Sequence, residues 1–186
     1  MTPKIYEVRF HGRGGQGAWT ASLLLAQAGL IEGKNIQSFP AFGPERAGAP
    51  ITAFTRISDE KIQLRSSIYE PDVVVILDPT LLGPSVAEGI RKDTVLIVNT
   101  DNPAKVVLDV LGLEGIKTWT VDATSLAINV LGRPITNTAM LGSVVKATNV
   151  VMLGSMLRVV KERFDGKISE LNVELVKKAH EEVKQG

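Results

Sequence analysis

Two hydrophobic periods alternate along this chain, and together they predict a succession of strands and helices. Residues 73–77 form an unbroken, mostly β-branched run, Val-Val-Val-Ile-Leu, which is typical of a central parallel strand. Residues 51–58 follow a period of two, which also predicts a strand. Further strands are predicted at residues 4–10, 35–39, 94–98 and 117–121, with residues 61–64 as a hairpin partner of the 51–58 strand.

Helical segments are predicted between and after these strands. Residues 16–30, which include Trp19, are apolar on nearly every face, so this helix should be buried on more than one side. Either a partner chain or the C-terminal helices would cover the side that the sheet leaves open. The other helices are predicted at residues 84–91, 123–130, 137–163 and 169–184.

This order of elements predicts an α/β fold with a mostly parallel sheet flanked by helices, a Rossmann-like sandwich. No internal repeat or linker interrupts the pattern, so residues 1–186 are expected to form a single domain. The carboxyl ends of parallel strands are where such folds bind ligands. Asp78, Asp101 and Asp122 follow predicted strands, and we interpret each of them as a helix cap or turn residue.

Composition narrows the classes of function. The chain has 186 residues, of which 44% are hydrophobic and 22% charged, and its net charge is +1. A nearly neutral chain is not expected to have nucleic acid as its main partner. No apolar run reaches the length of a membrane span, and residues 1–6 do not resemble a signal peptide, so we expect no membrane contact and a cytoplasmic location.

The chain contains no cysteine and only two histidines. It therefore cannot hold an iron–sulfur cluster through thiolates, form a disulfide or use a cysteine nucleophile. Two histidines are too few for a histidine-based metal site. We predict no metal ligands and no catalytic residues in this chain, so that any metal centre used for electron transfer would belong to another chain.

A glycine-rich turn separates the first predicted strand from the first predicted helix, with glycines at positions 12, 14, 15 and 17. Such a turn lets backbone N–H groups approach a ligand, because no Cβ stands in the way. The following helix directs its positive N-terminal end at the same place. The turn therefore predicts an anion site, most simply for a phosphate group, and the alternative is a tight turn that binds nothing.

Gly12, Gly14 and Gly17 also match the dinucleotide fingerprint G-x-G-x-x-G, which makes an autonomous Rossmann-type oxidoreductase the alternative function. That fingerprint requires an acidic residue about 20 positions later to bind the ribose. The strand predicted at residues 35–39 ends without an acid. A P-loop is disfavoured as well, because no Lys-Ser or Lys-Thr pair follows the glycines.

A second unusual loop spans residues 40–50 and contains three prolines and two glycines. Its only charged residues are Glu45 and Arg46. Either the loop is a surface turn, or it presents this pair to an anionic ligand or a partner chain, where arginine could clamp a carboxylate or phosphate. If the first two strands are parallel neighbours, this loop and the glycine turn lie side by side, and Arg13 and Arg46 converge.

Several motifs along the chain resemble the gamma subunits of 2-oxoacid:ferredoxin oxidoreductases, above all those of the pyruvate enzymes. The resemblance covers nearly the whole chain in the family's order. Many relatives have Arg-Gly-Gly where this chain has Ala-Gly-Ala at 47–49, and the Gly-Ala-Pro form is closer to the pyruvate type. The matching segments are residues 11–17 (HGRGGQG), 42–50 (FGPERAGAP), 56–59 (RISD), 71–72 (PD), 78–82 (DPTLL) and 137–142 (NTAMLG).

The resemblance implies a subunit of a cytoplasmic heterotetramer that converts pyruvate, coenzyme A and oxidised ferredoxin into acetyl-CoA, carbon dioxide and reduced ferredoxin. Thiamine diphosphate, magnesium and [4Fe–4S] clusters would lie on the alpha, beta and delta partners, and this chain would be inactive alone. Its own contribution would be assembly and a surface facing the active site, on the coenzyme A side. The residues predicted to form that surface are Gly12, Arg13, Gly14, Gly15, Gln16, Gly17, Glu45 and Arg46.

Overall fold

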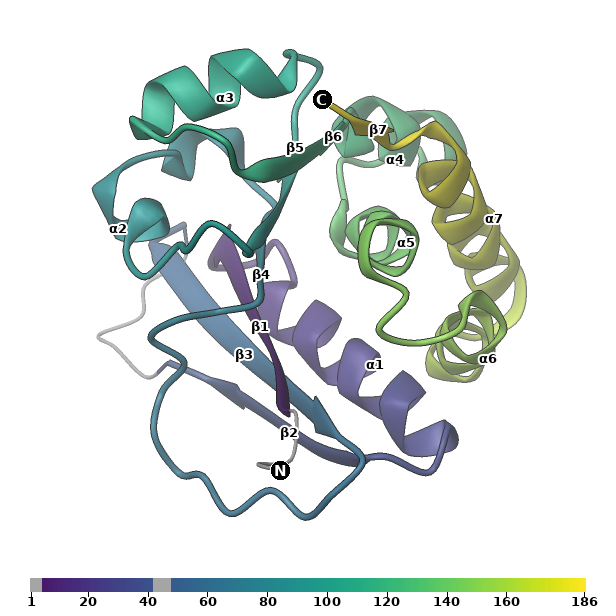
Figure 1. Ribbon diagram of the computed structural model, residues 1–186. Coiled ribbons are helices and arrows are strands. Elements are labelled where there is room, and N and C mark those ends of the chain that lie inside the picture. The colour runs from purple at the N-terminus through teal and green to yellow at the C-terminus, as the bar shows by residue number, and fades with distance from the viewer. Residues whose placement is uncertain (1–4, 42–47) are drawn as a thin grey trace.

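A mixed β-sheet forms the centre of the computed structural model, which describes residues 5–41 and 48–186 (Figure 1). The strand order within these residues is β2-β3-β1-β4-β5-β6-β7. β1, β4, β5 and β6 run parallel to one another, whereas β3 is antiparallel to both β1 and β2, and β7 to β6. The bounds are β1 Ile5–Arg13, β2 Asn35–Pro40, β3 Pro50–Ser58, β4 Val73–Ile76, β5 Val95–Asn99, β6 Lys117–Val121 and β7 Lys184–Gln185.

Helices cover both faces of this sheet, which confirms the predicted α/β class (Figure 1). One face carries α1, α4, α5, α6 and α7, and the other carries α2 and α3. The bounds are α1 Ala18–Ile31, α2 Pro84–Ala87, α3 Ala104–Leu111, α4 Ala123–Leu131, α5 Asn137–Thr148, α6 Leu153–Arg163 and α7 Gly166–Glu182, with a short 3₁₀ turn, η1, at Pro79–Leu81.

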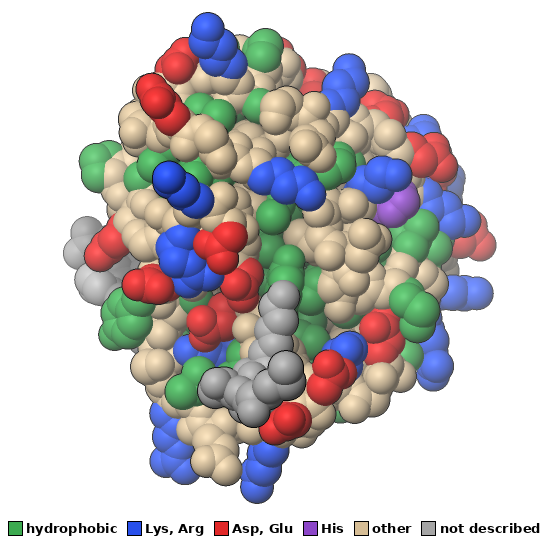
Figure 2. All heavy atoms as spheres, in the orientation of Figure 1, with side chains coloured by type: hydrophobic (Ala, Val, Ile, Leu, Met, Phe, Trp, Pro, Cys, Tyr) green, Lys and Arg blue, Asp and Glu red, His purple; other side chains and the backbone are tan. Residues whose placement is uncertain are grey.

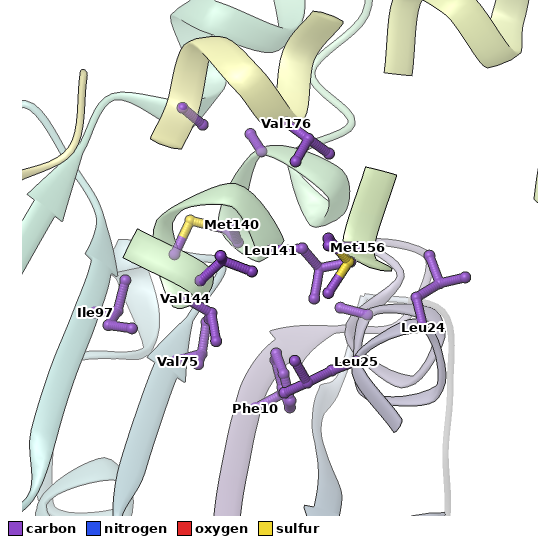
Figure 3. Packing of buried hydrophobic residues seen from close by; sticks show 14 of the residues in the cluster. Phe10, Leu24, Leu25, Val75, Ile97, Met140, Leu141, Val144, Met156 and Val176 are labelled. Atoms are coloured by element: carbon purple, nitrogen blue, oxygen red, sulfur yellow. The ribbon is translucent and has the colours of Figure 1, made fainter. Parts of the chain in front are cut away.

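The central strand β4 explains why the fold has two hydrophobic cores. Its residues are all buried, as the unbroken apolar run predicted, and successive side chains point to opposite faces. Val73 and Val75 pack with α1 and α5, whereas Val74 and Ile76 pack with α2 and α3. Figure 3 shows the larger core, in which α5 lies between the sheet and α7.

The burial of α5 rests on a close contact with α7. Residues 137–145 and 147 of α5 are all buried. A Cβ on Gly142 would collide with the backbone carbonyl of Val176 and would lie 3.1 Å from the backbone nitrogen of His180. The two helices can approach this closely only because position 142 has no side chain.

We therefore expect Gly142→Ala to lower the free energy of unfolding by about 1–3 kcal/mol, since the added methyl group forces two packed backbones apart. Gly154→Ala in α6 is the matched control, because a Cβ there meets nothing within 4 Å. Alanine is the better helix former, so the control should be neutral or stabilising by about 0.5–1 kcal/mol. Urea unfolding of both variants checks this, and equal stabilities would contradict it.

Helix α1 is covered by the chain's own elements on two sides, by the sheet and by α5 and α6. Of the two interpretations offered for its apolar sequence, the structure shows the one based on the C-terminal helices. Helix α1 nevertheless has exposed apolar side chains, since the exposed fraction is 53% for Trp19 and 58% for Leu30. Coverage of this exposed face by a partner stays a prediction.

The other predicted elements require several corrections. Residues 61–64 form no strand; side chains hold this segment instead, as Gln37 Nε2 donates to the carbonyl of Leu64 over 2.9 Å. The helix predicted at 137–163 is two helices, because Asn149 adopts the left-handed conformation and ends α5. The helix predicted at 84–91 ends at Ala87, and the sequence interpretation missed α3 and β7 entirely.

Candidate functional site

The strand order of the sheet has its switch point between the neighbouring strands β1 and β4. From β1 the chain continues to β2 and β3 on one side, whereas β4 continues to β5 and β6 on the other. Folds of this class usually bind ligands at such a point, beyond the carboxyl ends of the strands. Here the chain's own side chains fill it: Arg13 Nε lies 3.1 Å from Asp78 Oδ2, and Gln16 Nε2 donates to the same oxygen over 2.8 Å.

Further hydrogen bonds fix this cluster. Arg13 Nη2 donates to Thr80 Oγ1 over 2.8 Å, and Gln16 Oε1 accepts the backbone N–H of Arg13 over 2.7 Å. Asp78 also caps η1 by accepting the N–H of Thr80, as its position after a strand predicted. Burial alone would raise the pKa of Asp78, but the hydrogen bonds from Thr80 and Gln16 and the charge of Arg13 together lower it below 3.8.

We expect Asp78→Asn to destabilise the chain by about 1–2 kcal/mol at neutral pH, because it weakens hydrogen bonds to a charged acceptor. A lowered folded-state pKa means that the carboxylate contributes stability above its unfolded pKa and loses it as the pH falls. The difference between wild type and variant should therefore shrink below about pH 4. Chemical unfolding at pH 7 and at pH 3 measures it.

The control for this experiment is Asp59→Asn. Asp59 also forms an ion pair, with Lys34 over 2.7 Å, but its side chain is 85% exposed. Exposed pairs contribute little, so this substitution should change stability by less than about 0.5 kcal/mol. If both variants behave alike, the Asp78 cluster contributes nothing beyond an ordinary surface pair.

The two unusual loops meet at one edge of the sheet. The N–H of Gly14 donates to the carbonyl of Ala49 over 2.9 Å, and Arg13 Nη1 donates to the carbonyl of Gly48 over 3.2 Å. The prediction that the first two strands are parallel neighbours was wrong, because β3 lies between β1 and β2. Both strands are antiparallel to β3, so they still end at the same edge. Glu45 and Arg46 lie outside the described residues.

A pocket of about 510 Å³ opens at the N-terminal end of α1. Gly15, Gln16 and Gly17 of the glycine turn are among its lining residues. Gly17 is the N-cap of α1 in a left-handed conformation, with φ 79°, and no side chain of the described residues caps the helix. The first turn of α1 contains no acidic residue either. The unpaired N–H groups and the positive end of the helix are therefore available to an anion.

The lining of this pocket also contains two arginines that the sequence interpretation did not single out. Arg133 follows α4, and Arg163 ends α6. Neither forms an ion pair among the described residues. The guanidinium of Arg163 lies 5.6 Å from the ring centre of Phe164, and Ile168 on the rim is 60% exposed. The pocket thus joins positive charge to an apolar surface, which suits an anion with an apolar or aromatic portion.

The structure therefore divides the predicted site residues into groups. Gly15, Gln16 and Gly17 line the pocket. Arg13 points instead to the Asp78 cluster, and Gly12 packs near Ala18, whose Cβ would be 3.1 Å from a Cβ on Gly12.

Asp122 and Asn99, two other polar residues at strand ends, have structural partners. Asp122 caps α4 by accepting the N–H of Ser125 over 2.9 Å, as predicted. Asn99 links β5 to α4 through Thr124 and donates to the carbonyl of Leu77. A group of acids that includes Asp101 and Glu181 lines a separate hollow beyond β5 and β6. Among the described residues, no three His, Cys, Asp or Glu side chains are placed to bind a metal ion.

The surface charge is mixed. Figure 2 shows Lys and Arg interspersed with Asp and Glu on the face that it displays. This agrees with the net charge of +1 and offers no continuous basic surface on that face. Within the part of the chain that the structure describes, no helix has the length and apolar character of a membrane span.

Comparison with known proteins gives consistent matches over the whole chain. A family model described as pyruvate ferredoxin/flavodoxin oxidoreductase matches residues 7–182. The pyruvate/ketoisovalerate oxidoreductases common subunit gamma of Pyrococcus abyssi is 50% identical over 178 residues, which cover 95% of this chain and 96% of that protein. The pyruvate synthase subunit PorC of Methanocaldococcus jannaschii is 49% identical over 180 residues, which cover 96% and 97%. The crystal structure of pyruvate oxidoreductase subunit PORC from Thermotoga maritima matches with a TM-score of 0.91 at 40% identity, covering 98% and 99%.

Proposed function

The chain belongs to the pyruvate ferredoxin/flavodoxin oxidoreductase family, and from this we propose that it serves as the gamma subunit of an enzyme acting on pyruvate. Membership in the family confirms the resemblance that the motifs indicated. The proposed reaction converts pyruvate, coenzyme A and oxidised ferredoxin into acetyl-CoA, carbon dioxide and reduced ferredoxin. Thiamine diphosphate, magnesium and [4Fe–4S] clusters, carried by the alpha, beta and delta partners, supply the carbon chemistry and the electron transfer.

Within this assembly we propose that the pocket beside the glycine turn holds the phosphate-bearing end of coenzyme A. The observation that carries the proposal is the convergence of an uncapped helix N-terminus with two arginines, Arg133 and Arg163, that have no ion-pair partner in the described chain. Coenzyme A combines phosphate groups with an aromatic base and an apolar arm. The volume of about 510 Å³ lies within the usual range for small-molecule sites.

Each group in the pocket then has a definite task. The backbone N–H groups around Gly15 and Gly17 donate to phosphate oxygens, and the arginines balance the negative charge. Phe164, which already lies beneath the Arg163 guanidinium, offers a face for the base. The dinucleotide alternative lacks support, because β2 ends at Pro40 with no acid and β3 separates β2 from the glycine turn.

Steady-state kinetics of the assembled enzyme test this proposal. We expect Arg163→Gln to raise the KM for coenzyme A by about tenfold or more, since a hydrogen-bonded charged contact is lost. The KM for pyruvate and the subunit composition on size-exclusion chromatography should stay unchanged. Gly15→Val should act in the same direction, because Gly15 has φ 95°, which a β-branched residue adopts only with strain.

Arg158→Gln provides the matched control on the same helix, because Arg158 is 65% exposed and pairs with Glu162. It should leave both KM values as in the wild type. An unchanged KM for coenzyme A in Arg163→Gln and Gly15→Val would contradict the assignment of the pocket. Pyruvate oxidation by the isolated chain, or its failure to co-purify with other subunits, would contradict the proposed role as a subunit.

A further inference from the structure

A second cavity lies on the opposite face of the sheet from the glycine-turn pocket. Its volume is about 380 Å³, and it lies beside α2, over β1 and β3. The side chains of Arg9 and His11 point to this face, because they alternate along β1 with Val8 and Phe10, which belong to the core under α1. No part of the proposed coenzyme A pocket contributes to it.

Arg9 is a buried cation with incomplete partners. Its residue is only 6% exposed, and its Nη2 donates to the carbonyls of Val86 and Glu88 over 2.9 and 2.6 Å. Within the described residues, its Nε has no hydrogen-bond partner and no carboxylate lies within ion-pair distance. Glu88 attracts Arg9 electrostatically but forms no ion pair with it, so the buried charge is only partly balanced, and an anion from outside the chain would stabilise this arrangement.

His11 lies two residues along the same strand and is 7% exposed. Burial, followed by the charge of Arg9, lowers the pKa of His11 to about 3, so its imidazole is neutral at physiological pH. Its Nε2 is buried and without a partner among the described residues. The cavity is therefore lined by one buried positive charge, Arg9, beside one neutral polar group, His11, with the exposed Glu88 as its negative charge.

We propose that this cavity binds a small organic monocarboxylate with an apolar body. The carboxylate would lie against the guanidinium of Arg9, with a second polar atom of the ligand near His11. Apolar side chains of the lining, Phe54, Ile68 and Leu81, would contact the ligand's hydrocarbon part.

Two observations select this class of ligand. Arg9 is the only cation among the described lining residues, and Glu88 adds a negative charge, so di- and triphosphates would be disfavoured. The volume of about 380 Å³ is also within the range of small-molecule sites and much larger than a single carboxylate side chain needs. This argues against a lone acidic residue of a partner chain as the occupant.

The test is isothermal titration of the full chain with 3-phenylpropionate, its neutral amide and inorganic phosphate. The carboxylate should bind at least about tenfold more tightly than either of the other two. Arg9→Met should weaken carboxylate binding by about tenfold or more, whereas Arg91→Met should not, since Arg91 lies outside the cavity in a surface ion-pair group. Circular dichroism establishes that each variant is folded.

Should Arg9→Met fail to fold, Ser85→Trp provides the decisive variant, because Ser85 is an exposed lining residue and a large side chain there would fill the cavity. It should abolish carboxylate binding. The proposal is overturned if the carboxylate shows no binding up to about 10 mM, or if the amide or phosphate binds equally well. It is also overturned if the folded Arg9 or Ser85 variant binds like the wild type. Arg163→Gln should leave this binding unchanged, which separates the two sites.

Discussion

Replacing Arg56 by alanine is expected to lower the free energy of unfolding by about 3–5 kcal/mol. Arg56 is 1% exposed and is among the largest fully buried side chains in the described chain. Its Nε donates to Glu7 Oε1 over 2.7 Å, and its Nη1 and Nη2 donate to Gln37 Oε1 and to the carbonyl of Ser67. One guanidinium thus joins β1, β2 and β3 to the segment after β3. Alanine would leave a cavity and an unpaired carboxylate.

Two further variants separate charge from packing. Arg158→Ala removes an exposed ion pair on α6 and should change stability by less than about 0.5 kcal/mol. Arg56→Met keeps most of the buried volume and lacks the charge, so it should be less destabilising than alanine. Urea unfolding gives all three values. If Arg56→Ala lowers the free energy of unfolding by less than about 1 kcal/mol, the buried ion pair and its hydrogen bonds do not stabilise the fold appreciably.

The family motif that contains Arg56 illustrates what a sequence pattern can and cannot predict. The period of two over residues 51–58 correctly predicted a strand. It could not predict that this strand lies between β1 and β2, because neighbours in a sheet are chosen by contacts between distant residues. The pairing of Arg56 with Glu7 spans 49 positions, and local periodicity does not report such a contact.

The missed elements differ in how far they were predictable. Helix α3 carries buried residues at Ala104, Val107 and Leu111, with Gly112 in the left-handed conformation at its end, so both the spacing and the cap were present in the sequence. Strand β7 has two exposed polar residues and no such signal. It forms only because β6 offers an edge to the chain leaving α7.

The residues of the candidate site also differ in how far the sequence could predict them. The glycine turn was recognisable because its residue types are needed for the conformation, as the φ of 79° at Gly17 shows. Arg133 and Arg163 were not, because each is an ordinary exposed arginine in its own local sequence. They reach the same pocket only because the C-terminal helices pack against α1, which is a property of the whole fold.

The buried histidine of β1 leads to a second large expected effect, a loss of stability on mild acidification. The folded chain lowers the pKa of His11 to about 3, whereas an unfolded chain should have the ordinary value of 6.5. Between these values the unfolded state binds a proton that the folded state does not bind. Stability is therefore greatest above pH 6.5 and falls as the pH is lowered, by up to about 1.4 kcal/mol per pH unit.

From pH 6.5 to 4.5 this amounts to a loss of about 2–3 kcal/mol, before most carboxylates titrate. The charged groups around His11 in its cavity are Arg9, which adds to the lowering of its pKa, and Glu88 at the margin. His180 contributes in the same direction, because burial and then Lys146 lower its pKa as well.

His11→Leu removes the titrating group, so its stability should vary much less with pH over this range, whereas His180→Gln should keep most of the wild-type slope. Urea unfolding at half-unit pH steps measures the slopes, and an equally steep slope in His11→Leu would show that the dependence arises elsewhere.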